Sequence, residues 1–414
     1  MNKNPENSEI DKLANDLEQI VRKISFPRFF GTKAEIKTRN ILKADLDERG
    51  LQYTLETFNA SDFFMRRVNQ IPYFIQGLLV LVLVLSLLLN FNMVYVLVLS
   101  IALLITAFCM EGIIRKIKYP AMYSRFADIK QSENIVIPDP RGDDAVKHAS
   151  LNIHFVGHTD SKTEWPNPNV FFLAEFISVF FGSVIITVHG IIYALYAIIN
   201  PGTVLHSPYI FLYGLIFAAL DMLRIITRYF PGESQGAVDD AIGVAMTILL
   251  LEKSKKLGLK NVEVTGVLSG AEEVGEVGAY SYVEKRKNDP GFTKARNHFI
   301  ILDGLGGGDV IFYFPTRGLQ FKKFSIHILN AVEKLLEVNH RSTKGFTFKK
   351  MWMPPPVNTD HNGIVKHGYP AFVFASPGND NSHSKDDTPD KINYQGVARF
   401  VDFLLALLKE LDSK

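Results

Sequence analysis

Two long regions with almost no charged residues place the strongest constraint on how this chain can fold. The first covers 71–114 and is broken by the polar residues at 90–92. The second covers 170–230 and is broken at 200–202 and 207–208. Each leaves two apolar stretches of about 20 residues, the length that a helix needs to cross a bilayer. The sequence therefore predicts about four transmembrane helices, arranged as two inserted hairpins.

Basic residues near the ends of these regions predict an orientation in the membrane. They are Arg66, Arg67, Arg115, Lys116, Lys118, Lys162, Arg224 and Arg228. The two short hairpin loops contain no Lys or Arg. Because basic residues favour the cytoplasmic side, we expect a multi-pass integral membrane protein with the hairpin tips outside and all other segments in the cytoplasm.

The remaining segments, 1–70, 115–169 and 231–414, alternate between helical and strand patterns. Helices are expected at 10–24, 33–49, 240–256, 274–287 and 394–411, and strands at 51–58, 151–156, 262–268, 298–302 and 371–375. This alternation predicts one α/β domain with helices on both faces of its sheet. The two hairpins, 71–114 and 170–230, are then insertions into that domain.

Charge and cysteine content exclude some classes of protein. The formal net charge of the 414 residues is +2, and no basic stripe is interleaved with aromatic residues, so we expect no nucleic-acid partner. Cys109 is the single cysteine, which excludes a disulfide within the chain.

Five short segments place acids or histidines just after predicted strands or at helix starts. They are 157–160, 238–240, 271–273, 302–304 and 382–387. Each segment alone is typical of a loop histidine or of an acidic helix cap. Together, at the sheet edge where α/β proteins bind ligands, they would form a self-repelling cluster that cations stabilise. Mixed histidine and carboxylate ligands suit zinc, with manganese or cobalt as substitutes.

The same segments resemble motifs of the co-catalytic di-zinc peptidases of the bacterial leucyl aminopeptidase and glutamate carboxypeptidase type. The chain contains Gly-His-Thr-Asp-Ser at 157–161, Asp-Asp-Ala-Ile-Gly at 239–243 and Glu-Glu-Val-Gly at 272–275, in the family's order. Residues 25–31, 359–361, 368–371 and 383–388 resemble its remaining motifs. The resemblance covers essentially all of the chain outside the hairpins and implies a mixed, mostly parallel sheet.

The resemblance also implies roles for individual residues. Asp239 would bridge two Zn²⁺ ions, and the other ligands would be His158, Asp303, Glu273 and His383. Glu272 would be the general base, Asp160 would support His158, and Asp360 would lie close to the site or its substrate. We expect a membrane-bound exopeptidase, most simply an aminopeptidase, that attacks a peptide bond with a metal-bridged hydroxide.

Two alternatives remain open at this stage. A glutaminyl cyclotransferase has a similar His-x-Asp-Ser-Lys segment, which 158–162 resembles, although that branch has Ser where this chain has Asp240. A non-catalytic membrane scaffold or receptor would be expected to lack some ligands. Because the second hairpin lies between His158 and Asp239, the expected substrate is a peptide presented close to the bilayer. The oligomeric state is not predicted.

Overall fold

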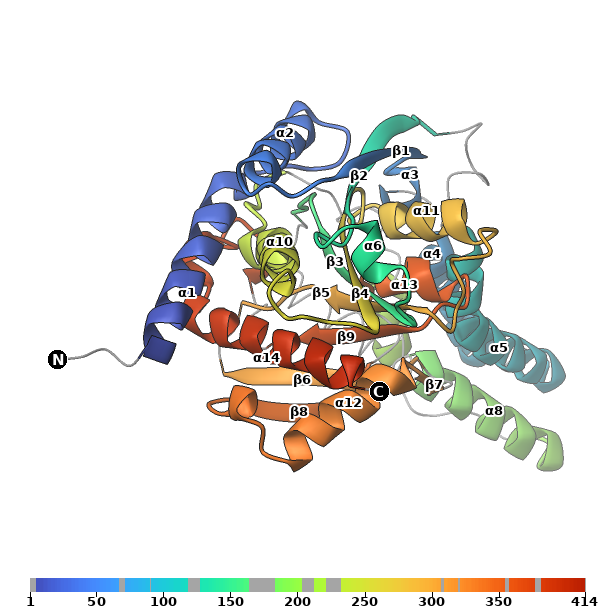
Figure 1. Ribbon diagram of the computed structural model, residues 1–414. Helices are drawn as coiled ribbons and strands as arrows, with labels where there is room; N and C mark the ends of the chain where they lie inside the picture. The colour runs from blue at the N-terminus through green and yellow to red at the C-terminus, as the bar shows by residue number, and fades with distance from the viewer. Residues whose placement is uncertain are drawn as a thin grey trace. The chain divides into compact units, whose positions relative to one another are not determined.

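The computed structural model describes residues 5–66, 71–89, 91–117, 127–163, 183–202, 212–220, 232–306, 309–318, 321–353, 357–376 and 381–413. Its chain divides into two compact units (Figure 1). The larger unit comprises Met1–Ala60, Ile129–Thr163 and Gly232–Lys414, and the smaller unit comprises Ser61–Asp128 and Glu164–Pro231. The sequence-based division at 70, 115, 169 and 231 stays a prediction.

A mixed sheet of nine strands forms the centre of the larger unit. The strands are β1 Thr54–Ala60, β2 Lys130–Ile137, β3 Leu151–His158, β4 Val262–Ser269, β5 Asn297–Leu302, β6 Val310–Arg317, β7 Lys322–Lys323, β8 Thr347–Met353 and β9 Ala371–Ala375. Their order is β1-β2-β4-β3-β5-β9-β6-β7, with β8 paired to β6. The four central strands β4, β3, β5 and β9 are parallel.

Composition explains why these central strands are parallel. Nearly every residue of β3, β4 and β5 is buried, so both faces of each strand are covered. Strands of this kind read as continuous apolar runs, which is typical of parallel strands between two layers of helices. Their shared direction brings their carboxyl ends to one edge of the sheet.

Helices cover both faces of this sheet (Figure 1). On one face α10, Ile242–Ser254, packs against β3, β4 and β5 and against α1, Pro5–Ile24, and α14, Tyr394–Asp412. On the other face α11, Val277–Arg286, and α13, His361–Val365, pack together against the strands. Residues 242–251 of α10 are all buried, as expected for a helix enclosed by a sheet and two other helices.

The predicted helices and strands of this unit are confirmed, with boundaries shifted by a few residues. For example, α2 is Lys33–Glu48, and Gly50 follows it with a φ of 62°. The sequence prediction missed β2, β6, β7, β8 and α12, Ile326–Glu337. β6 contains Pro315, and its pairing with β8 shifts register between Tyr313 and Thr316. Proline interrupts strand patterns, so it concealed this strand.

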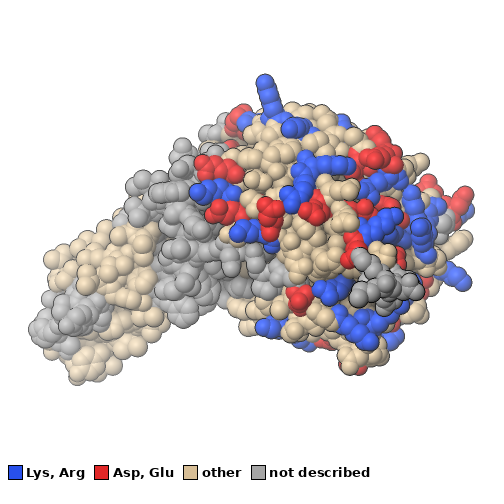
Figure 2. All heavy atoms as spheres, turned by 90° about the vertical axis from the view of Figure 1, so that its left-hand side faces the viewer, with Lys and Arg blue, Asp and Glu red and all other residues tan. Residues whose placement is uncertain are grey.

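Charged side chains on the larger unit are mixed in sign. Figure 2 shows Lys and Arg interspersed with Asp and Glu over its visible face. Such a surface lacks the single-sign stripe with which proteins bind a nucleic-acid backbone. The absence of a nucleic-acid partner stays a prediction.

The smaller unit consists of helices. They include α3 Phe63–Arg66, α4 Ile71–Leu88, α5 Met93–Ile117, α8 Ser183–Ile199 and a helical segment at 212–220. An apolar cluster that includes Leu83, Val96 and Ala194 joins α4, α5 and α8. Gly190 of α8 permits close packing, because a Cβ there would overlap Ser100 of α5.

The prediction of four transmembrane helices is wrong. Within the described residues, none of the helices combines the length and the apolar composition that crossing a bilayer requires. α4 has 18 residues and α8 has 17, which span about 27 and 26 Å against a hydrocarbon core of about 30 Å. Parts of the predicted second hairpin, 164–182, 203–211 and 221–231, lie outside the described residues.

The same finding overturns the predicted localisation. The predicted multi-pass membrane topology, its cytoplasmic orientation and the bilayer-proximal substrate all depended on these spans.

His154 is a buried polar residue in the middle of β3. Its Nε2 lies 2.8 Å from Oδ1 of Asn297, its Nδ1 lies 3.2 Å from the Tyr282 hydroxyl, and its ring stacks on Phe299. A neutral ring fits these partners, since Nε2–H donates to the amide oxygen and Nδ1 accepts from the hydroxyl. Burial lowers the pKa of His154 from 6.5 to about 3.

We predict that His154 makes the folded state sensitive to acid. The unfolded chain binds the proton below pH 6.5 and the folded chain only near pH 3, so stability falls as the pH drops through this window. At pH 5 the loss is about 2 kcal/mol. Urea unfolding at pH 7.5 and at pH 5 gives the free energy of unfolding at each pH. The difference between these two free energies should be smaller in His154→Phe than in the unmodified chain by about 2 kcal/mol. The exposed His148→Asn is the control, and an unchanged pH difference in His154→Phe would contradict the prediction.

Candidate metal centre

The parallel strands bring the predicted site residues to one edge of the sheet. His158 is the last residue of β3 and pairs in register with Ser269, the last residue of β4. Glu272 and Glu273 follow β4, and Asp303 follows β5 directly. Since β3 lies between β4 and β5, these three loops are neighbours. The site residues are therefore gathered by strand order, although they are far apart in the sequence.

Close backbone packing adds the acidic pair at 239–240 to this edge. These residues lie in a turn, Ala237–Ala241, that leads into α10; both have non-helical backbone angles, and the peptide bond between them is cis. A Cβ on Gly157 would lie 2.6 Å from the carbonyl carbon of Gly243, and a Cβ on Gly243 would overlap Leu302 O. Glycine at both positions lets the start of α10 rest directly on the ends of β3 and β5.

Asp239 lies between two histidines and presents one carboxylate oxygen to each. Nε2 of His158 is 2.9 Å from Oδ1, and Nε2 of His383 is 3.1 Å from Oδ2. Nε2 of His383 is also 3.3 Å from Oε2 of Glu273. Burial alone would raise the pKa of Asp239, but the charge of His383 and the hydrogen bond from His158 hold it well below its usual value. This carboxylate is therefore ionised and faces two nitrogen ligands.

Asp240 and Asp303 are acids of the same cluster with raised pKa values. Asp240 accepts the backbone N–H of His158 at 2.9 Å and that of Gly243 at 3.1 Å, so it fastens the two loops together. Burial, and then the negative charge of Asp239, raise the pKa of Asp303 to about 7. The raised value reports a surplus of negative charge, which a cation would relieve.

Asp160 supports the glutamate pair. Its two carboxylate oxygens accept the backbone N–H groups of Glu272 at 3.1 Å and Glu273 at 3.2 Å. The atom nearest Nδ1 of His158 is the Asp160 carbonyl oxygen at 3.1 Å, whereas the carboxylate is 3.6 Å away. When Nδ1 carries the proton, Nε2 presents its lone pair toward Asp239, as a metal ligand must.

Glu272 is held beside the cluster. It is buried, and the preceding Ala271 has a positive φ of 55°, which turns the chain at this point. Burial raises the pKa of Glu272 well above its usual value; the charge of His158 opposes the shift, and that of Glu273 adds to it. A carboxyl whose pKa is raised holds a proton more readily than an exposed one, which suits a group that takes up and releases a proton.

Asp360 lies close to the same edge. It precedes α13, is buried, and its carboxylate accepts a hydrogen bond from the Ser269 hydroxyl at the end of β4. Burial is the largest cause of the raised pKa values of Glu272 and Asp303, and the negative charge of Asp360 is one of the smaller causes. Its role near the site or its substrate stays a prediction.

Three further residues of the centre had no predicted role. Lys162 is buried, and its Nζ lies 3.0 Å from Oε2 of Glu273. Arg28 is fully buried and donates to the carbonyl oxygens of Thr159 and Gly236, both at 2.8 Å, and to that of Gln235.

Asp387 accepts the backbone N–H groups of Val238 at 2.7 Å and Asp239 at 3.3 Å, so it holds the turn at 237–241. Burial, then the charge of Asp239, raise its pKa to about 7. In the sequence, Asp387 and Arg28 were marked only by their positions inside motifs. Their contacts are with backbone groups, which every residue has, so the sequence does not reveal these contacts. Lys162 had been interpreted as a membrane-flanking residue.

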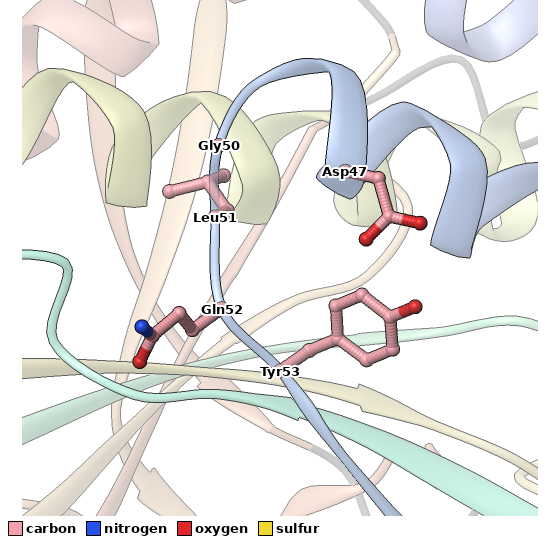
Figure 3. A pocket seen from close by; sticks show the side chains of 5 residues that line it. All are labelled: Asp47, Gly50, Leu51, Gln52 and Tyr53. Atoms are coloured by element: carbon pink, nitrogen blue, oxygen red, sulfur yellow. The ribbon is translucent and has the colours of Figure 1, made fainter.

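A surface pocket elsewhere in the larger unit has none of this chemistry. It lies between α2 and β1 and is lined by Asp47, Gly50, Leu51, Gln52 and Tyr53, as Figure 3 shows. A single carboxylate and one phenol cannot form a metal centre.

Comparisons with known proteins agree with this geometry. Residues 215–408 match the model of Peptidase family M28. This part of the chain is similar to the Peptidase family M28 domain. No curated protein matches the sequence significantly.

Solved structures share the fold of this chain at low sequence identity. An aminopeptidase from Aneurinibacillus sp. strain AM-1 is 13% identical with a TM-score of 0.53, covering 96% of this chain and 94% of its own. A zinc aminopeptidase from Bacillus subtilis is 12% identical with a TM-score of 0.52, covering 96% and 95%. A glutaminyl cyclase from Fimbriiglobus ruber is 13% identical with a TM-score of 0.51, covering 97% and 95%.

The residues gathered at this edge of the sheet fit a zinc ion. Ligand atoms of His158, Asp239 and Glu273 lie within 4.8 Å of one another. Oε1 of Glu273 is buried and has no hydrogen-bond partner among the described residues, so it has a free lone pair. Nitrogen and carboxylate ligands in a buried cluster are those that zinc prefers. Of the predicted ligands, Asp303 lies outside this closest group, and His383 contacts it through Asp239 and Glu273.

We predict that Arg28→Met destabilises the larger unit of this chain. The substitution leaves three loop carbonyl oxygens without their donor, at roughly 1–3 kcal/mol for each one that water cannot reach. We expect a loss of about 3 kcal/mol or more in urea unfolding. The half-exposed Arg22→Met is the matched control and should change stability little. Equal stability of the two variants would show that Arg28 does not hold these loops.

Proposed function

We propose that this chain is a zinc-dependent exopeptidase, acting as an aminopeptidase, with Glu272 as its general base. The observation that carries the proposal is the separation of roles between two adjacent glutamates. Glu273 contacts His383 and belongs to the ligand cluster, whereas Glu272 is buried beside it with a raised pKa. The family match supports peptidase chemistry in general.

The ligand arrangement supports two ions. Each oxygen of Asp239 faces a different histidine, so one ion would bind between His158 and Oδ1 and the other between His383 and Oδ2. Asp303 is assigned to the first ion and Glu273 to the second. Bound zinc would polarise the peptide carbonyl and acidify a water molecule.

The protein's own residues then move the proton. Glu272 accepts it from the attacking water and returns it to the leaving amine, which is the task of a general base that becomes a general acid. Asp160 fixes the backbone of this glutamate through its N–H, so the carboxylate starts from a defined position. Adjacent placement of a free and a ligating glutamate keeps the proton carrier within reach of the metal cluster.

Charge supports action at the amino end of a peptide. A carboxypeptidase needs a cation to bind the carboxylate of its substrate. Arg28 already donates to backbone carbonyls, and Lys162 already pairs with Glu273. The acidic surplus around Asp303 suits the free α-ammonium of an N-terminal residue instead.

A substrate screen tests the proposal. The zinc-loaded full chain should release the first residue from amino acid amides and from unblocked peptides, and an N-acetyl group should abolish release. A glutaminyl cyclotransferase, favoured by the Lys at position 162 and by the shared fold, would instead release ammonia from peptides with N-terminal glutamine. Cyclisation without hydrolysis, or cleavage only at carboxyl ends, would refute the aminopeptidase assignment.

We predict that Glu272→Gln retains zinc and loses activity. The amide keeps the size of the side chain but cannot carry the proton, so kcat/KM should fall by about 10²–10⁴. Elemental analysis should show the same metal content as the unmodified chain. Glu337→Gln, an exposed change on α12, serves as the control. Substantial hydrolysis by Glu272→Gln with unchanged metal content would exclude the assigned role.

A further inference from the structure

Lys162 is a buried cation at the centre of an acidic cluster. It follows β3 by four residues, and its side chain is 5% exposed. An ammonium group is costly to bury unless a partner compensates the lost hydration. Its Nζ lies 3.0 Å from Oε2 of Glu273. Lysine is not a ligand in this centre, so its contact with a proposed metal ligand needs an explanation.

The two oxygens of Glu273 have different surroundings. Oε2 lies close to two positive or donor groups, Nζ of Lys162 at 3.0 Å and Nε2 of His383 at 3.3 Å. Oε1 is buried without a hydrogen-bond partner among the described residues. A metal ion that approaches Oε2 must therefore share this oxygen with an ammonium group.

We propose that Lys162 makes the two metal positions unequal, because its ammonium group lies against Glu273, the carboxylate assigned to the ion beside His383. The position beside His158 uses other atoms, Nε2 of that histidine and Oδ1 of Asp239. Like charges repel strongly in a buried site, because the effective dielectric constant is far below that of water. The ion beside His383 is therefore the weakly held one, and the ion beside His158 is retained.

This inference rests on the proposed function, since it assumes that the centre binds two zinc ions. It adds an order of loading that the ligand set alone does not give. At low free zinc the protein holds one ion, and Lys162 neutralises Glu273. When free zinc rises, the second ion enters and the contact between the ammonium group and Oε2 weakens. The second ion is thus the exchangeable one.

A zinc titration of the metal-free full chain tests this order. Competition against a chromogenic chelator gives the number of ions and both dissociation constants without any assay of activity. The unmodified chain should bind two ions with dissociation constants that differ by about tenfold or more. Lys162→Met removes the charge and should tighten the second ion by about tenfold while changing the first by less than about threefold.

Matched variants keep the result interpretable. Lys162→Arg retains the charge and should retain the unequal affinities, whereas Lys162→Gln is neutral and still donates a hydrogen bond to Glu273. If Lys162→Met fails to fold, Lys162→Gln carries the test. Lys285→Met is the control, because this exposed lysine contacts the carbonyl oxygen of Thr57.

The outcomes separate this inference from the function on which it rests. Two ions of equal affinity in the unmodified chain would overturn the inference and leave the proposed function intact. An unchanged second dissociation constant in both neutral variants would also overturn it. Absence of zinc binding in the unmodified chain would overturn the proposed function as well.

Discussion

Concentrated negative charge at one edge of the sheet is the constraint on which the rest of the centre depends. The order β4-β3-β5 brings the acids after β4 and β5 next to His158, and the packing of α10 adds Asp239 and Asp240. These groups are mostly buried, where repulsion between carboxylates is strong. Burial raises the pKa values of Asp303 and Glu272, and repulsion from the neighbouring carboxylates adds to both shifts. Histidines and a lysine offset part of it, and divalent ions would offset the remainder.

Backbone groups do much of the positioning around this charge. Asp160 and Asp387 each accept two consecutive backbone N–H groups, the first from the glutamate pair and the second from the turn that contains Asp239. Arg28 acts in the opposite sense by donating to carbonyl oxygens of the loops after β3 and before α10. Anions thus hold N–H groups and a cation holds C=O groups, so the ligand loops are fixed by ordinary hydrogen-bonding complementarity. Such support leaves the ligand side chains themselves available for metal.

The candidate site was largely predictable, because short motifs place particular residue types directly after strands. His158, Glu273 and Asp303 are examples, since apolar runs ending in an acid or histidine reveal both the strand and its exit. Contacts that depend on the fold left no comparable signal, as with Lys162 and Glu273, which are distant in sequence. β6 was concealed by Pro315 and β8, Thr-Phe-Lys-Lys-Met-Trp-Met, by its lysines. The transmembrane prediction failed because apolar composition reports where burial is favourable but does not fix where each helix begins and ends.

The larger unit is assembled from three separated pieces of chain, and this has a consequence for how the protein is made. Arg28 comes from the first piece, His158 from the second and His383 from the third. α1 packs against α14, and Arg22 pairs with Asp390. The first helix of the chain therefore contacts segments near the carboxyl end, which are synthesised last. Bringing together segments that are so far apart in the sequence costs conformational entropy before the contacts between them form. Such long-range contacts slow folding. During synthesis on the ribosome, the metal ligands would come together only after position 383 has emerged. Until then the nascent chain would carry an apolar α1 face and an incomplete acidic cluster, and would depend on protection from premature association.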